Sequence, residues 1–296
     1  MTMEQGIIKI NEYNKLIESN LFRKMERFSN RFLNTNKIAL KDYMIKWVKD
    51  PLHQWSRQWE YPFVFERIKE YYKKRSNKSN NLKILDAGSG ITFFPYYIKS
   101  EFGKTEIYCC DRDASLASTY KKVSNTMKKK INFEKQKIHN LRYPDNTFDA
   151  IYCISVLEHT KNYEEIMKEF KRVLKPGGIL IVTFDIALEG DADIPLKKAE
   201  KFVNSLLVIF SEKTQRELSP LNIKNYGKIL TTKYISEINA GLLPGIMTNS
   251  KKKSGKNVKE FAKKKIILVK NVIITLMKLR LPRKINLACY CGSALK

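Results

Sequence analysis

Glycines and acidic residues that follow two neighbouring apolar runs are the part of this sequence best suited to chemistry. One run ends in Asp86-Ala-Gly-Ser-Gly90, and a second run ends at Asp111, 21 residues after Gly90. Glycine lets a ligand lie against bare backbone, and the N–H groups of a helix that starts there face the ligand. A carboxylate at the tip of the neighbouring strand accepts hydrogen bonds from both hydroxyls of a ribose. The spacing predicts a site for a nucleotide-like cofactor.

Two common nucleotide motifs do not match this loop. A dinucleotide fingerprint of the form G-x-G-x-x-G requires glycine where the chain has Phe93. A Walker A loop requires a Gly-Lys-Ser/Thr sequence that is missing here. Both classes of nucleotide site are therefore disfavoured.

Five segments in a fixed order resemble the motifs of class I S-adenosylmethionine-dependent methyltransferases, and the resemblance covers residues 82–186. The segments are Asp86 to Gly90, Asp111, Tyr143 to Asp149, Val156 to His159 and Leu174 to Ile181. The chain departs from the family pattern at Thr92, where a third glycine often stands, and at Lys137, in place of an acid near the adenine. Motif order is much stronger evidence than any single motif.

The resemblance implies S-adenosylmethionine as cofactor. It also implies that the segment before the first strand closes over the methionine end of the cofactor, whose carboxylate needs a cationic or hydroxyl partner. In this segment Arg57 and Tyr61 are the candidates, although for Trp55, Trp59 and Tyr61 taken singly the packing of an N-terminal cap is the favoured role. The expected cofactor-binding residues are Arg57, Tyr61, Asp86, Gly88, Gly90, Asp111, Arg112, Ile138, His139 and Cys153.

His159 and Asp185 are the candidate catalytic residues. A histidine at this end of the sheet can remove a proton from an acceptor hydroxyl, because its pKa is close to working pH. Asp185, at the tip of the expected fifth strand, is the second candidate for the base or for acceptor contact. The alternative for Glu158 and His159 is structural, since Leu-Glu-His recurs in the family irrespective of acceptor. Methyl transfer depends mainly on alignment, and an amine needs a base much less than an alcohol does.

Strands and helices alternate along residues 82–185, which predicts an α/β fold with a parallel sheet covered on both faces. The resemblance implies a Rossmann-like, doubly wound, seven-stranded, mostly parallel sheet with an antiparallel last strand, here at 285–295, and an N-terminal helical cap. Helical spacing of apolar residues predicts a basic helix over 257–280. The expected divisions are 1–80 for the cap, 81–186 for the cofactor-binding core, and 187–296 for an acceptor-binding insertion, basic helix and closing strand.

Positive charge is concentrated late in the chain. The net charge is +26, and residues 251–296 hold 14 basic residues against 1 acidic residue. This excess of positive charge makes three anionic partners candidates: a nucleic acid, an anionic substrate or a membrane surface. Lysine clusters at 251–253 and 263–265 favour association with anionic surfaces. The polar N-terminus lacks an apolar signal segment, so we expect a cytoplasmic protein, peripheral to the inner membrane face.

The five cysteines contain no C-x-x-C pair, so the sequence predicts buried thiols and no metal site.

Three functions are compatible with these features. The first is methyl transfer to a small-molecule, sugar or polysaccharide-precursor acceptor at oxygen, with an acceptor that is phosphorylated or lipid-linked. The second is an RNA methyltransferase, which the charge supports but which lacks a recognisable RNA-binding module. The third is a non-catalytic protein that retains cofactor binding. The sequence does not identify the oligomeric state.

Overall fold

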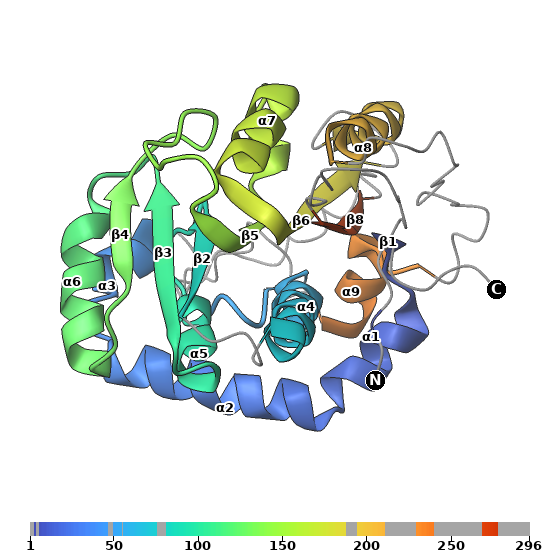
Figure 1. Cartoon of the computed structure of the whole chain (residues 1–296). Coiled ribbons are helices and arrows are strands. Elements are labelled where there is room, and N and C mark those ends of the chain that lie inside the picture. The colour runs from blue at the N-terminus through green and yellow to red at the C-terminus, as the bar shows by residue number, and fades with distance from the viewer. Residues whose placement is uncertain are drawn as a thin grey trace.

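A computed structural model describes residue 3 and residues 6–46, 50–54, 56–75, 81–187, 194–210, 229–239 and 268–277 of the chain (Figure 1). The strands are β1 (Gly6–Ile7), β2 (Leu82–Ala87), β3 (Thr105–Asp111), β4 (Asn132–Lys135), β5 (Phe148–Ile154), β6 (Leu174–Ala187), β7 (Ile194–Pro195) and β8 (Leu268–Met277). The helices are α1 (Ile10–Ile17), α2 (Asn20–Thr35), α3 (Lys41–Lys46), α4 (Arg57–Arg75), α5 (Phe94–Glu101), α6 (Leu116–Met127), α7 (Tyr163–Val173), α8 (Leu196–Phe210) and α9 (Thr232–Asn239). A short 3-10 helix spans Leu157–His159.

The described strands form one sheet in the order β1-β8-β6-β5-β2-β3-β4, with β7 beside β6. Strands β2 to β7 pair with one another only in parallel, which confirms the predicted mostly parallel α/β sheet. The chain runs from β2 outward to β3 and β4, and then returns to β5 and β6 on the other side of β2. Ligands of such sheets bind at the carboxyl ends of the strands where the order reverses. This topology places the candidate site between β2 and β5.

Both faces of the sheet are covered. Along β2, Ile84 packs into a cluster with the N-terminal helices, and the next residue, Leu85, packs into a cluster with α7 and α8. Successive strand residues point to opposite faces, so two separate clusters mean two buried faces. Strand β5 is buried along its whole length for the same reason. The predicted doubly wound arrangement is confirmed.

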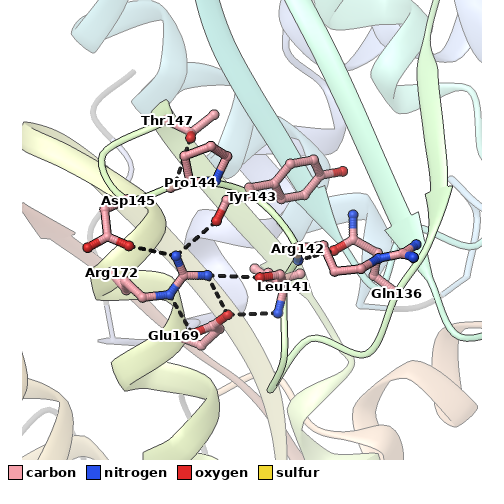
Figure 2. Close-up of polar contacts among 9 residues, drawn as sticks. All are labelled: Gln136, Leu141, Arg142, Tyr143, Pro144, Asp145, Thr147, Glu169 and Arg172. Carbon is pink, nitrogen blue, oxygen red and sulfur yellow. Dashed lines mark hydrogen bonds and ion pairs between the residues drawn. The ribbon is translucent and has the colours of Figure 1, made fainter.

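An ion cluster around Arg172 fastens helix α7 to the loop that leads into β5 (Figure 2). The Arg172 guanidinium donates to both carboxylate oxygens of Glu169, to Asp145 Oδ1 at 2.7 Å, and to the backbone carbonyls of Leu141 and Tyr143 at 2.8 and 2.9 Å. Glu169 Oε1 also accepts the backbone N–H of Leu141 at 2.7 Å. The hydrogen bond from Arg172 lowers the pKa of Glu169. Tyr143 and Asp145 of the 143–149 motif therefore help to hold helix α7 against this loop.

Apart from strand β1, the described N-terminal residues up to Arg75 form helices and the turns between them, as expected for a helical cap. Helix α2 begins at a side-chain cap, where Ser19 Oγ accepts the N–H of Phe22 at 3.1 Å. Helix α4 is buried along most of its length, with Trp59 and Phe63 fully buried. Trp55 lies outside the described residues. The divisions at residues 80 and 186 stay predictions.

The C-terminal part differs from our expectation. Residues 268–277, expected within a helix, form strand β8, which pairs antiparallel with β6 and also with β1. The segment from Val272 to Thr275 is rich in β-branched residues, which favour strands, and its apolar spacing suits either element. Within the described residues the sheet already has eight strands, whereas seven were expected. The closing strand predicted at 285–295 lies outside the described residues and stays a prediction.

Candidate functional site

The loop after β2 has a backbone conformation that depends on glycine and on hydrogen bonds to the end of β3. Gly88 and Gly90 have positive φ angles of 79° and 50°, which favour glycine. The N–H groups of Gly88 and Ser89 donate to the carbonyl of Cys110 at 2.9 and 3.0 Å. A Cβ added at Gly88 would lie 2.6 Å from Val156 Cγ2, so a larger residue would displace the segment after β5. The loop is thus fixed between the ends of β3 and β5.

Asp111 joins this loop to the end of β3. Its Oδ2 accepts the N–H of Gly90 at 3.1 Å, and its Oδ1 accepts the N–H of Asp113 at 2.9 Å. The side chain is half-buried. Each carboxylate oxygen has two lone pairs, so Asp111 keeps acceptor capacity for a pair of ligand hydroxyls.

Asp86 lies at the carboxyl end of β2 and is 5% exposed. Burial raises its pKa to about 8; the nearby Asp111 charge adds to the rise, and Tyr152 and Arg57 oppose it. A carboxyl group with this pKa ionises readily when a cation is placed beside it. Asp86 therefore matches a cationic ligand group.

Arg57 and Glu60 connect helix α4 to the end of β5. Arg57 Nη1 lies 2.5 Å from Glu60 Oε2, and Glu60 is completely buried. Ser155 Oγ donates to Glu60 Oε1 at 2.7 Å, although the two residues are 95 positions apart. Ser155 itself has a φ of 45°, and its N–H donates to Thr183. Burial by itself lowers the pKa of Arg57, but the Glu60 charge raises it overall.

Glu158 and Asp185 form a second acidic group beside this ion pair. Burial raises the pKa of Glu158 well above its ordinary value, and the nearby Asp185 charge raises it further, while Arg57 opposes the shift. Glu158 Oε2 is buried and accepts no hydrogen bond from the part of the chain that the structure describes. Asp185 is 5% exposed on β6. We call Arg57, Glu60, Asp86, Glu158 and Asp185 the Arg57 cluster.

The other predicted site residues are placed as follows. Tyr61 is buried, and its ring packs against Phe93 and Phe94 at centroid distances of 5.1 and 4.7 Å. His159 is exposed at the end of the 3-10 helix, whereas its neighbour Glu158 faces the cluster. Buried core positions hold Ile138 and Cys153, and exposed positions hold Arg112 and His139. Their predicted cofactor contacts stay predictions.

Two residues at the site were not assigned to it from the sequence. Tyr43, on α3, lies over the loop so closely that a Cβ on Gly90 would meet its hydroxyl. Burial raises the pKa of Tyr43, and the charges of Asp111, Arg57 and Asp86 all act on it. Glu60 was assigned no role from the sequence. No signal in the sequence indicates that either residue contacts the core, because both contacts join distant parts of the chain.

Four carboxyl groups and one guanidinium meet where the strand order reverses. Glu60 is bonded to Arg57, and burial raises the pKa of both Asp86 and Glu158 beside this ion pair. Buried carboxylates of this kind are stable only if they are protonated or face a cation. The arrangement is thus suited to a ligand with a ribose, beside Asp111, and positive charge.

Comparison with known proteins relates residues 85–182 to a protein family. Residues 85–182 match the methyltransferase domain family, which confirms the resemblance predicted from the motifs of the same segment. An uncharacterised protein of Methanocaldococcus jannaschii is 31% identical over 150 residues, which is 48% of this chain and 59% of that protein. The ubiquinone biosynthesis O-methyltransferase of Rickettsia akari is 30% identical over 122 residues, 41% of this chain and 46% of that enzyme.

Among solved structures, a SAM dependent methyltransferase from Aquifex aeolicus is similar at 23% identity and a TM-score of 0.39, covering 53% of this chain and 79% of that one. The chain spans about half the length of the curated relatives described above. The similarity is therefore to a domain and not to the whole of either protein. Among the described helices, none combines the length and apolarity needed to cross a bilayer.

Proposed function

We propose that this chain, whose residues 85–182 belong to the methyltransferase domain family, transfers a methyl group from S-adenosylmethionine to a small-molecule acceptor. The observation that carries the proposal is the joined pair of the Gly88–Gly90 loop and Asp111, at the carboxyl ends of adjacent parallel strands. The bound cofactor supplies a methyl group on a positively charged sulfur.

The residues present suit this cofactor. Asp111 keeps acceptor capacity for the two ribose hydroxyls, and the loop glycines leave backbone accessible beside it. Asp86 is held largely protonated by burial and ionises when an ammonium group lies near it. Arg57 has further N–H donors besides the one bonded to Glu60, and these can bind a carboxylate. Tyr61 stays a candidate for the same carboxylate.

Glu158 and Asp185 support a role at the acceptor. Both carboxyl groups lie at the carboxyl ends of adjacent strands, where the acceptor must approach, and Glu158 Oε2 accepts no hydrogen bond among the described residues. A carboxylate there can orient an acceptor hydroxyl and accept its proton. We therefore propose Asp185, with Glu158 beside it, as the group that holds the acceptor proton. His159 is the alternative and is more exposed.

The acceptor is proposed only as a class. The curated relative from Rickettsia akari is by its name an O-methyltransferase of ubiquinone biosynthesis, and another relative is a phosphoethanolamine N-methyltransferase of Arabidopsis thaliana. These names support a small molecule. Transfer to oxygen, and an acceptor that is a sugar or polysaccharide precursor, phosphorylated or lipid-linked, remain our finer proposal. The excess of positive charge favours an anionic acceptor or surface.

Titration with S-adenosylmethionine in a calorimeter tests the cofactor site. Asp111→Ala removes charge-assisted hydrogen bonds to the ribose and should weaken binding by about 1–3 kcal/mol. Gly88→Val should abolish measurable binding, because it combines a positive φ with a collision against Val156. Gly103→Ala is the matched control, since a Cβ there meets no atom within 4 Å. Unchanged affinity in both Asp111→Ala and Gly88→Val would place the cofactor elsewhere.

A further inference from the structure

Helix α2 carries a row of arginines on its outward face. Arg23, Arg27 and Arg31 are exposed and lie four residues apart, so they project from one side of the helix. The opposite side is buried in the core through Phe22, Met25, Phe28 and Phe32. In Figure 1 this helix forms the lower rim of the molecule. The arginine row therefore faces solvent over residues 23–31 of the helix.

The arginine row is not neutralised by nearby acids. Arg23 donates to the backbone carbonyl of Glu18, and the Arg31 guanidinium lies 5.5 Å from the centre of the Phe28 ring. Within the described residues, no carboxylate forms an ion pair with Arg23, Arg27 or Arg31. The one acid inside α2, Glu26, is bonded to His53 at 2.8 Å. The outward face of α2 therefore has a net positive charge.

The segment that follows α2 adds exposed apolar side chains. Ile38 is 92% exposed and Ile45 is 62% exposed, and they are two of the four large apolar residues exposed in the described part of the chain. Lys37 and Lys41, both exposed, accompany them. The buried side of the same segment is formed by Leu40, at 2% exposed, with Tyr43 packed against the core. The outward side thus combines apolar and basic groups with a single exposed acid, Asp42.

We propose that this surface, made of Arg23, Arg27, Arg31, Lys37, Ile38, Lys41 and Ile45, docks on an anionic lipid bilayer. Basic side chains bind anionic headgroups, and isoleucines gain free energy by entering the boundary between headgroups and acyl chains. A nucleic acid would use the arginines but would give the isoleucines no apolar partner. The combination on one continuous stretch of chain favours the lipid surface.

Docking through this surface would bring the cofactor loop close to the bilayer. Tyr43 lies on the same short segment as Ile45, and its hydroxyl lies over Gly90. An acceptor carried on a lipid would then reach the site without leaving the membrane. Docking itself does not depend on the proposed methyl transfer, so each can fail without the other.

Co-sedimentation with vesicles tests the proposal. The full-length protein is mixed with phosphatidylcholine vesicles, with and without phosphatidylglycerol, at low and at near-physiological salt. We expect binding only to the anionic vesicles, and on the order of tenfold or more weaker binding when Arg23, Arg27 and Arg31 are all replaced by glutamine. Ile38→Ser with Ile45→Ser should remove the part of the binding that survives higher salt.

A charge-matched control lies on helix α8, which Figure 1 shows at the opposite rim. Replacing Lys197, Lys198 and Lys201 by glutamine removes the same charge from exposed positions and should leave binding unchanged. Circular dichroism of each variant is the check that it is folded. Equal binding by the arginine and lysine variants would overturn the proposal. So would a wild-type protein that ignores anionic vesicles, or one that binds duplex RNA in preference to them.

Discussion

Two arginines of this protein stand in opposite ionic surroundings. Arg172 is 33% exposed and is matched by Glu169 and Asp145, and the pKa of Glu169 is lowered (Figure 2). Arg57 is 20% exposed and is bonded to a completely buried Glu60, among further acids of which Asp86 has its pKa raised to about 8. The first group is complete in itself. In the second group, the pKa values of Asp86 and Glu158 are raised by burial.

The charged residues around Arg172 stabilise the fold, whereas those of the Arg57 cluster are suited to binding a ligand. In the Arg172 group, donors and acceptors are paired with one another and with backbone carbonyls, so nothing is gained by adding a ligand. In the Arg57 cluster, burial makes the carboxyl groups of Asp86 and Glu158 costly to ionise, and a cation beside them would stabilise their charged form. Groups with perturbed pKa values gather at functional sites for this reason.

The largest expected effect is on stability, from Glu60→Ala. This change leaves the Arg57 guanidinium and Ser155 Oγ without their buried partner, and should cost about 3–5 kcal/mol of unfolding free energy. Glu169→Ala, in the more exposed group, should cost about 1–2 kcal/mol. Urea unfolding of both variants measures the difference. Equal losses would contradict the distinction between the two groups.

The next effect is on cofactor affinity. Arg57→Lys replaces five N–H donors by a compact ammonium that cannot hold Glu60 and a ligand carboxylate together. S-adenosylmethionine should bind about tenfold more weakly, equivalent to about 1.4 kcal/mol. Arg172→Lys, measured in the same calorimeter, should bind the cofactor as the wild type does. A loss of affinity in both variants would mean that Arg57 acts only through the fold.

The two groups should also give opposite dependences of stability on pH. The raised pKa of Asp86 means that its folded form binds a proton more tightly than the unfolded chain does. Its stabilising contribution is thus present below about pH 4 and is lost as pH rises through about 8. Glu169 has a lowered pKa, so its contribution is present above its ordinary pKa of 4.5 and is lost as pH falls below it.

Thermal midpoints of the ligand-free protein between pH 3 and 9 measure both slopes, with the range set by the shifts above. Asp86→Asn should reduce the fall of the thermal midpoint as pH rises toward 8, and Glu169→Gln should reduce its fall as pH drops below 4.5. If Asp86→Asn kept the wild-type decline, Asp86 would not be the titrating group.

The smallest effect is expected for His159→Gln. His159 is exposed, whereas Glu158 faces the Arg57 cluster, so turnover at neutral pH should stay within about threefold of the wild type. Asp185→Asn is the contrasting variant and should lower turnover by about 10²-fold or more if the acceptor is an alcohol. A pH profile of turnover for both variants decides the assignment. Loss of activity in His159→Gln but not in Asp185→Asn would mean that His159, and not Asp185, accepts the proton of the acceptor.

The sequence of apolar runs and turn signals along the chain was enough to predict much of the fold. The alternation of strands and helices from residue 82 to 185 predicted the parallel sheet, because each apolar run and each turn signal is a property of adjacent residues. The glycine loop and Asp111 were predicted for the same reason, since strand ends at one edge of a parallel sheet must meet. The strand at 268–277 was missed because β-branched residues at helical spacing suit either element.

Tertiary structure alone decided which distant residues complete the site. Ser155 meets Glu60 across 95 residues, and Tyr43 covers Gly90 from a six-residue helix. Glu158, in the 3-10 helix after β5, comes beside Asp185 on the neighbouring strand β6. None of these contacts follows from spacing, because each depends on how the N-terminal helices pack on the sheet or on which strands are neighbours. Burial also set the ionic character of the site, since Asp86 and Glu169 are ordinary acids in the sequence and differ only in their surroundings.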